Sequence, residues 1–136
     1  IQSDHGTPNI DGVSDGHHPL SHHGQDPERI AQLKIIETEI LTCLSDFLDG
    51  LKQPSENGSG LLEQTSVLFG SNLGNANAHD PRNLPIILAG GKHKHGRFIQ
   101  HNKKDNVPLC NLFLFLLQSM GIESDQFGSS TGTLDI

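Results

Sequence analysis

The sequence contains no tryptophan and no tyrosine, although it has six phenylalanines. Trp and Tyr are the commonest stacking platforms for bases and sugars, so their absence argues against a lectin or a base-stacking protein. Basic residues are also few, because nine Lys and Arg face 16 Asp and Glu, a formal net charge of −7. We therefore expect no general basic field that attracts nucleic acid or an anionic membrane.

Long apolar runs are absent as well. The longest run lies around residues 112–117, far below the roughly 20 residues needed to cross a bilayer, so we predict no membrane span. The two cysteines, Cys43 and Cys110, each fall within an apolar helical pattern. This placement favours buried free thiols, with a disulfide as the alternative.

The chain begins with a polar segment, and segments with a regular spacing of apolar residues follow it. Residues 1–25 hold five of the nine histidines with almost no apolar periodicity, which predicts a His-rich irregular segment. The run Asp26-Pro27-Glu28 then combines a helix N-cap, a proline at the first helical position and an acid in the first turn. Apolar residues recur at steps of three and four until Pro54, so a long helix is expected there.

The second half of the chain contains short apolar runs. Residues 66–70 and 85–89 are typical of strands covered on both faces in a parallel sheet, and residues 97–100 predict a weaker strand. Residues 107–120 predict a second helix with Gly121 at its C-terminal end.

The order of elements indicates an α/β fold, part of a mixed or mostly parallel sheet with flanking helices. Two or three strands are few for an independent sheet, so we expect the sheet to be incomplete in this chain. Residues 26–136 are then the C-terminal α/β portion of a single domain. A chain that starts at Ile1 rather than Met also suggests a processed protein or a fragment.

Residues 17–23, HHPLSHH, place four imidazoles and a hydroxyl within seven positions. Neutral imidazole is the commonest side-chain ligand for zinc and similar metals. If Pro19 begins a helical turn, His18 and His22 share one face, as two ligands of one ion require. The alternative, which we weigh equally, is a solvated loop that hydrogen-bonds its own backbone.

Further side chains could support these imidazoles. Asp15 and the upstream pair Asp4-His5 are candidates to fix an imidazole tautomer. Ser21 lies next to two histidines, but no Gly-x-Ser-x-Gly elbow surrounds it, so a serine-hydrolase function is disfavoured.

Residues 71–80, SNLGNANAHD, form a second candidate site because they leave the end of a predicted strand. Ligands of open α/β sheets bind at that edge. His79 and Asp80 are the stronger candidates, since Asn72 and Asn75 are equally typical of ordinary turns.

Residues 92–97, KHKHGR, form a local basic cluster that could hold a phosphate or sulfate. A solvated hairpin tip is the favoured interpretation, and we assign this cluster no role at this point.

The motif at residues 18–23, HPLSHH, matches the HxxSHH signature, and the chain thus resembles the HXXSHH family of bacterial secreted proteins of unknown function. The agreement starts near residue 10 and continues, in the same order, through GVSDG, DPE, LPIILAGG and FGSSTG at residues 12–16, 26–28, 84–91 and 127–132. Members of that family are longer, so this chain looks like their C-terminal portion.

The family in turn resembles the alkaline-phosphatase and sulfatase superfamily, whose α/β fold carries a metal site at the carboxyl ends of its strands. This resemblance implies a secreted or periplasmic location and places His79 and Asp80 near the metal. The sequence departs from the superfamily at Asn72-Leu73, where its enzymes have an Asp-His pair.

The resulting hypothesis is a metal-dependent hydrolase that acts on phosphate or sulfate esters of small molecules or glycans, with zinc the expected metal and no nucleic acid as partner. The upstream part of the same parent protein, outside this chain, would supply the nucleophile and the remaining ligands. The candidate metal ligands are His18, His22, His23 and His79, and the supporting residues are Ser21, Asp15, Asp80, Asn72 and Asn75. The alternative is a non-catalytic extracellular binding or structural protein with a hydrogen-bonded His scaffold.

Overall fold

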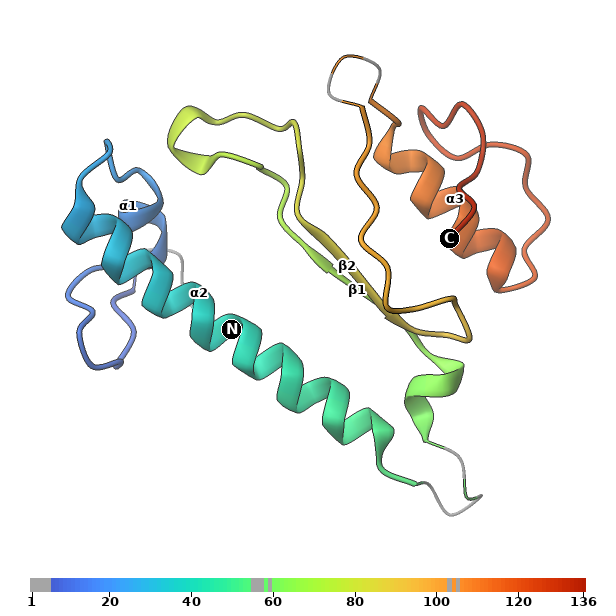
Figure 1. The fold of residues 1–136 in the computed structure, drawn as a ribbon, viewed down its shortest axis with the longest axis horizontal. Helices are drawn as coiled ribbons and strands as arrows, with labels where there is room; N and C mark the ends of the chain where they lie inside the picture. Colours follow the sequence, from blue (N-terminus) through green and yellow to red (C-terminus); the bar gives the residue numbers. More distant parts are fainter. Residues whose placement is uncertain (1–5, 55–57, 59, 103, 105) are drawn as a thin grey trace.

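The computed structural model describes residues 6–54, 58, 60–102, 104 and 106–136. The pair Asp4-His5 therefore lies outside the described residues. Figure 1 shows a long helix on one side of a two-stranded hairpin and a shorter helix on the other. In chain order the elements are α1 (His17–Ser21), α2 (Pro27–Lys52), the 3₁₀ turn η1 (Leu61–Gln64), β1 (Ser66–Gly70), the 3₁₀ turn η2 (Ala76–Ala78), β2 (Ile86–Gly90) and α3 (Leu109–Ser119).

The polar segment before α2, which we expected to be irregular, contains a short helix. The expected irregular structure is wrong at His17–Ser21, which forms α1 and packs against α2. Leu20 of α1 and Ile36 of α2 are each only 1% exposed. Burial of these side chains stabilises a turn too short to persist alone, which local composition could not reveal.

Helix α2 begins and ends as predicted. The Asp26 carboxylate accepts hydrogen bonds from the backbone N–H groups of Glu28 (2.8 Å) and Arg29 (3.4 Å), and the helix ends at Lys52, two residues before Pro54. Its apolar stripe is only partly covered, since Phe47 is 54% exposed.

The predicted strands form, but their pairing differs from the parallel arrangement. β1 and β2 pair antiparallel with Leu68 opposite Leu88, so the mixture of helices and strands is confirmed and the parallel prediction is wrong for these two strands. Parallel neighbours need a long crossover, usually a helix, whereas residues 71–85 contain only the short turn η2. Residues 97–100 are irregular, so the weaker strand was also wrong.

Both faces of the hairpin are apolar and partly open. Directly opposite residues of an antiparallel pair share a face, so Leu68 and Leu88 lie on one face and Phe69 and Ile87 on the other. Leu68 is 37% exposed and Ile87 is 43% exposed. The molecule exposes 9749 Å², compared with about 6,900 Å² for a compact protein of its mass. The hydrophobic surfaces of α2 and the hairpin are therefore not closed into one core.

Helix α3 and the C-terminal segment form a second packed region. Buried Asn111 donates to the Thr131 hydroxyl (3.3 Å) and accepts from the Thr131 backbone N–H (2.9 Å). The rings of Phe113 and Phe127 meet edge to face at 5.7 Å. The predicted helix end is confirmed at Gly121, whose φ of 78° suits glycine and whose N–H donates to the carbonyl of Gln118.

Both cysteines are free thiols, as favoured, but neither is fully buried. Cys43 is exposed on α2 and Cys110 is half-buried near the start of α3. In the described part of the chain, no helix combines the length and the hydropathy needed to span a membrane.

Leu20→Ala tests the packing of α1 on α2. Loss of this buried side chain should lower the free energy of unfolding by about 2–5 kcal/mol in chemical denaturation and release α1 from α2. Leu114→Ala is the matched control, because Leu114 is equally buried in α3. It should destabilise the protein similarly while leaving the His18 and His22 resonances in NMR spectra unchanged. Unchanged His22 resonances in Leu20→Ala would contradict this role of α1.

Candidate functional site

His22 and His79 lie side by side although 57 residues separate them in the sequence. Their Nε2 atoms are 3.3 Å apart, and their ring centroids are 4.8 Å apart with the planes nearly perpendicular, at 86°. At this distance and orientation the pair can share one proton, with one ring as donor and the other as acceptor. The structure thus joins the two segments that sequence analysis singled out separately.

His18 extends this pair on the α1 side. Its ring centroid lies 4.8 Å from that of His22, with the planes at 73°. The two residues are four apart, with His18 in α1 and His22 at its C-cap, and the turn brings their rings together although it begins at His17 rather than at Pro19. We call His18, His22 and His79 the imidazole row.

The loop after β1 is folded so that it presents His79. Asn75 caps η2 by accepting a hydrogen bond from the N–H of Ala78 at 3.1 Å. Asn75 and Asp80 then pair through their backbones across the turn. His79 sits between them with φ 49° and ψ 37°, a left-handed conformation that histidine adopts more readily than most residues. Asn75 therefore shapes the loop rather than reaching the row.

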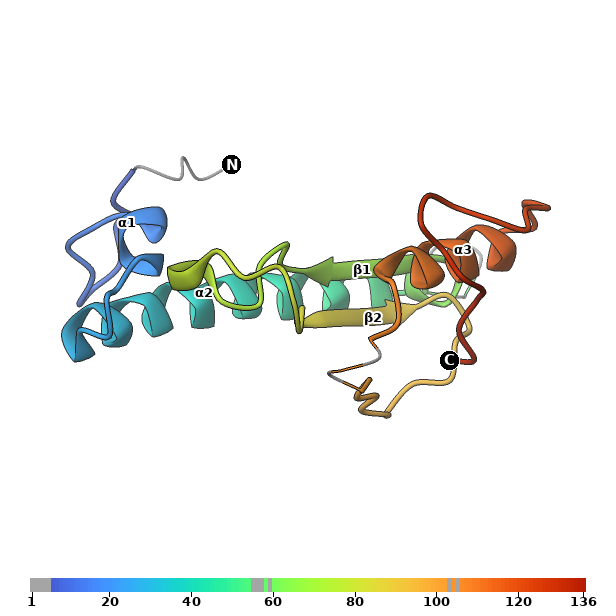
Figure 2. The ribbon, with the colours of Figure 1, turned by 90° about the horizontal axis from the view of Figure 1, so that it is seen from above.

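A second contact fixes the two segments to each other. The backbone N–H of Gly24, just after α1, donates to the side-chain oxygen of Asn77 in η2 at 2.8 Å. Figures 1 and 2 both show η2 beside the α1 end of the molecule. Sequence analysis missed Asn77, because its type is common in turns and its partner is distant in the chain.

Arg29 of α2 holds the backbone of His22 in the imidazole row. Its Nη1 donates to the carbonyl oxygen of His22 at 3.1 Å, and its Nη2 lies 4.0 Å from the Asp15 carboxylate. Asp15 also accepts from the N–H of Gly16 at 2.8 Å. Asp15 thus acts on the backbone around His22 through Arg29, and Arg29 is a site residue that sequence analysis missed.

The remaining predicted residues of the α1 segment face elsewhere. The buried Ser21 hydroxyl donates to the carbonyl oxygen of His18 at 2.8 Å, within its own helix. His23 accepts a hydrogen bond at Nδ1 from the N–H of Gln25 at 3.1 Å. Ser21 therefore stabilises α1 itself, and His23 stabilises the turn that follows it.

Asp80 is bound to a partner other than His79. Both oxygens of its carboxylate accept from the Arg82 guanidinium at 2.8 Å. These hydrogen bonds from Arg82 lower the pKa of Asp80 to about 2. Asn72 is exposed, and among the described residues its side chain makes no hydrogen bond to the row.

The surroundings of His22 favour its neutral form. Burial lowers its pKa, and the neighbouring His79, His18 and His23 lower it further because adjacent positive charges repel. A neutral imidazole has an available lone pair, which is the form that binds metals.

The His22–His79 spacing fits two ligands of one zinc ion. In tetrahedral geometry, two nitrogens at about 2.0–2.1 Å from zinc are roughly 3.3–3.4 Å apart. The observed Nε2–Nε2 distance of 3.3 Å agrees with this value. Within the described residues, however, no group of three or more His, Cys, Asp or Glu side chains is placed to hold a metal ion. The row therefore supplies two positioned ligands, with His18 beside them.

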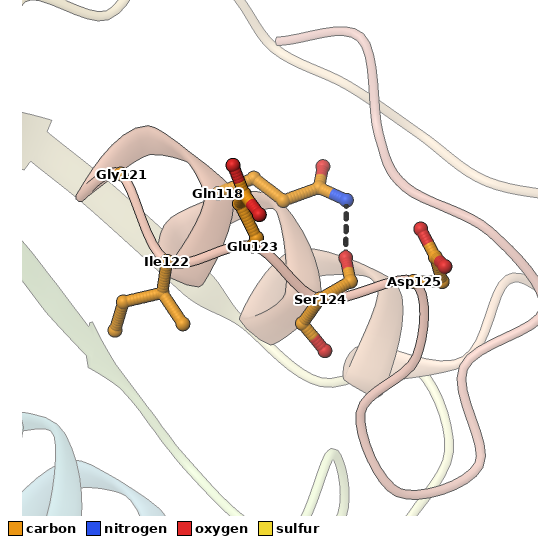
Figure 3. A pocket seen from close by; sticks show the side chains of 6 residues that line it. All are labelled: Gln118, Gly121, Ile122, Glu123, Ser124 and Asp125. Atoms are coloured by element: carbon orange, nitrogen blue, oxygen red, sulfur yellow. Dashed lines mark hydrogen bonds between the residues drawn. The ribbon is translucent and has the colours of Figure 1, made fainter.

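Two hollows in the surface of the described residues lie away from the row. One, at the C-terminal end of α3, is lined by residues from Gln118 to Asp125 and crossed by a 2.9 Å hydrogen bond from Gln118 to the carbonyl of Ser124 (Figure 3). Another lies near the end of β2 and includes Lys52, Glu63 and Lys92. None of the predicted site residues lines either of these two hollows.

No family model, curated protein or solved structure matches this chain. The resemblance to the HXXSHH family accordingly stays a prediction, and the geometry of the row stands on its own.

The lowered pKa of His22 predicts how the row responds to pH. In an NMR titration, His22 should titrate below the ordinary histidine value of 6.5, and His79→Asn should raise its pKa toward that value. His95→Asn is the control, since His95 binds the carbonyl of Gly90 instead. Because the folded pKa is lowered, the His22–His79 contact should be stable above pH 6.5 and weaken as the pH falls below it. An unshifted His22, or the same change in both variants, would contradict the contact.

Proposed function

We propose that the imidazole row is a zinc site and that the chain is part of a metal-dependent hydrolase of phosphate or sulfate esters. The observation that carries the proposal is the 3.3 Å approach of His22 and His79 from segments 57 residues apart. The hydrolase and its substrate class, esters of small molecules or glycans, follow from the sequence resemblance. The metal site follows from the donor chemistry of the row.

The neighbouring contacts support a role in metal binding because they hold both ligands before any ion arrives. Arg29 holds the His22 carbonyl, and the Gly24–Asn77 hydrogen bond holds the two segments together. Contacts that fix the backbone around both ligands in advance reduce the ordering cost of binding. His18 is exposed and next to His22, so a change of its side-chain rotamer could add a third nitrogen.

The chemistry expected at such a site is hydrolytic. A divalent ion held there would activate water and neutralise charge on the ester oxygens. His79 and His18 are exposed, so an ester group could approach the row from solvent. Following the resemblance, we propose that the upstream part of the same parent protein supplies the nucleophile and the other ligands.

The same contacts favour a second function if they serve only as hydrogen bonds and hold no metal. His22 and His79 can share a proton, Ser21 bonds the carbonyl of His18, and Asn77 bonds the N–H of Gly24. These bonds fasten η2 to α1 without any metal. In this alternative the protein is a non-catalytic extracellular binding or structural protein.

Zinc titration distinguishes the two functions. The wild-type protein should bind zinc in isothermal titration calorimetry, and His22→Ala or His79→Ala should weaken binding on the order of 100-fold, since each removes one of few ligands. His101→Ala, an exposed histidine in the segment before α3, is the matched control and should bind as the wild type does.

The outcomes separate clearly. Absence of zinc binding in both this chain and the full-length parent protein, with His79→Ala merely less stable, would establish the scaffold in place of the metal site. Zinc binding that survives both substitutions would place the metal elsewhere. If zinc binds as expected, hydrolysis of p-nitrophenyl phosphate and p-nitrophenyl sulfate by the zinc-loaded full-length parent protein tests the reaction.

A further inference from the structure

Although the net charge of the chain is negative, one stretch of its sequence is strongly basic. Residues 81–104 contain six Lys and Arg and no Asp or Glu, a formal charge of +6. The remainder has three basic and 16 acidic residues, a formal charge of −13. The expectation of no general basic field was drawn from the net charge of the whole chain and does not apply to this stretch. Arg82 is paired with Asp80, and the other five basic residues lie between residues 92 and 104. Cations gathered in one segment in this way attract anions.

The central part of this stretch is an irregular segment between β2 and α3. We call residues 92–102 the basic loop. Figure 2 shows the chain leaving the plane of the hairpin after β2 and returning to reach α3. Lys92, Lys94 and Arg97 are exposed.

The basic loop also exposes apolar side chains directly after its charges. Phe98 is 90% exposed, the highest value among the large apolar side chains of the described residues, and Ile99 is 46% exposed. Leaving an aromatic ring in water is unfavourable, so the pair is a candidate contact surface.

The root of the basic loop is attached to the fold. His93 Nε2 lies 2.9 Å from the Ser66 hydroxyl, and the His93 ring lies 5.1 Å from that of Phe115. His95 Nε2 lies 2.8 Å from the carbonyl oxygen of Gly90. These contacts fix the beginning of the loop, where Lys92 and Lys94 flank His93, and Arg97, Phe98 and Ile99 follow it.

We propose that the basic loop binds an anionic lipid surface. Phe98 and Ile99 enter the headgroup region, while Lys92, Lys94 and Arg97 contact lipid phosphates. Basic residues beside exposed apolar side chains are the combination that binds peripheral proteins to anionic lipids. This contact is separate from the imidazole row and does not depend on it.

A lipid surface fits these side chains better than a soluble polyanion does. Lys and Arg would bind either one, but Phe98 and Ile99 gain from apolar surroundings that only the membrane offers. Phe98 alone could stack on a base, whereas Ile99 has no such interaction. The acidic remainder of the chain is repelled by anionic lipid, which orients the basic loop toward it.

Vesicle co-sedimentation tests the proposal with the whole chain. Wild-type protein should bind phosphatidylcholine vesicles that contain phosphatidylglycerol, and bind pure phosphatidylcholine vesicles much more weakly. Phe98→Ala should reduce binding by about tenfold or more. Lys94→Glu with Arg97→Glu should reduce it by at least about 25-fold, since each basic residue contributes roughly fivefold near such a surface. Added salt should weaken binding by screening.

Two control variants match these changes elsewhere in the fold. Phe47→Ala removes a half-exposed ring from α2, and Lys34→Glu reverses an exposed charge on the same helix. Both should bind vesicles as the wild type does. Circular dichroism of every variant shows whether the fold is retained.

The proposal is overturned if the wild type does not bind the anionic vesicles at low salt. It is also overturned if the loop variants bind as well as their controls. Tight binding to heparin that Phe98→Ala leaves unchanged, without vesicle binding, would assign the basic loop to a soluble polyanion instead.

Discussion

The contact between His22 and His79 is the interaction on which the candidate site depends. It joins two segments that are 57 residues apart and that belong to different parts of the fold, α1 and the loop after β1. The Gly24–Asn77 hydrogen bond runs beside it, and Arg29 holds the backbone of His22. Without this set of contacts, the histidines of α1 would be an isolated surface cluster and His79 a residue of an ordinary turn.

Local contacts fix the candidate site, although the rest of the molecule leaves much apolar surface exposed. Leu20 and Ile36 bury α1 against α2, and this small contact fixes the direction in which His18 and His22 face. The hairpin and the stripe of α2 expose apolar surface, and the molecule exposes about two-fifths more area than a compact protein of its mass. The geometry of the row therefore rests on local capping and a few buried side chains. Closure of one large core is not required for it.

The helix ends could be predicted from the sequence because they depend on neighbouring residues. The start of α2 followed from Asp26 and Pro27, and the end of α3 from Gly121, because caps act within one turn. The pairing of β1 with β2 was mistaken, because the connection between them contains only the short turn η2 and no crossover helix. His22 and His79 were each singled out, but their contact was not, because it is long-range. Arg29 and Asn77 were missed because their roles depend on partners that only the fold brings near.

The most direct test of the account is X-ray absorption spectroscopy at the zinc edge on protein loaded with one equivalent of zinc. The account predicts at least two imidazole nitrogens at about 2.0–2.1 Å, with the imidazole scattering reduced by one ligand in His79→Ala. A spectrum with oxygen ligands alone, or one identical in wild type and His79→Ala, would contradict the central claim that His22 and His79 bind the same ion.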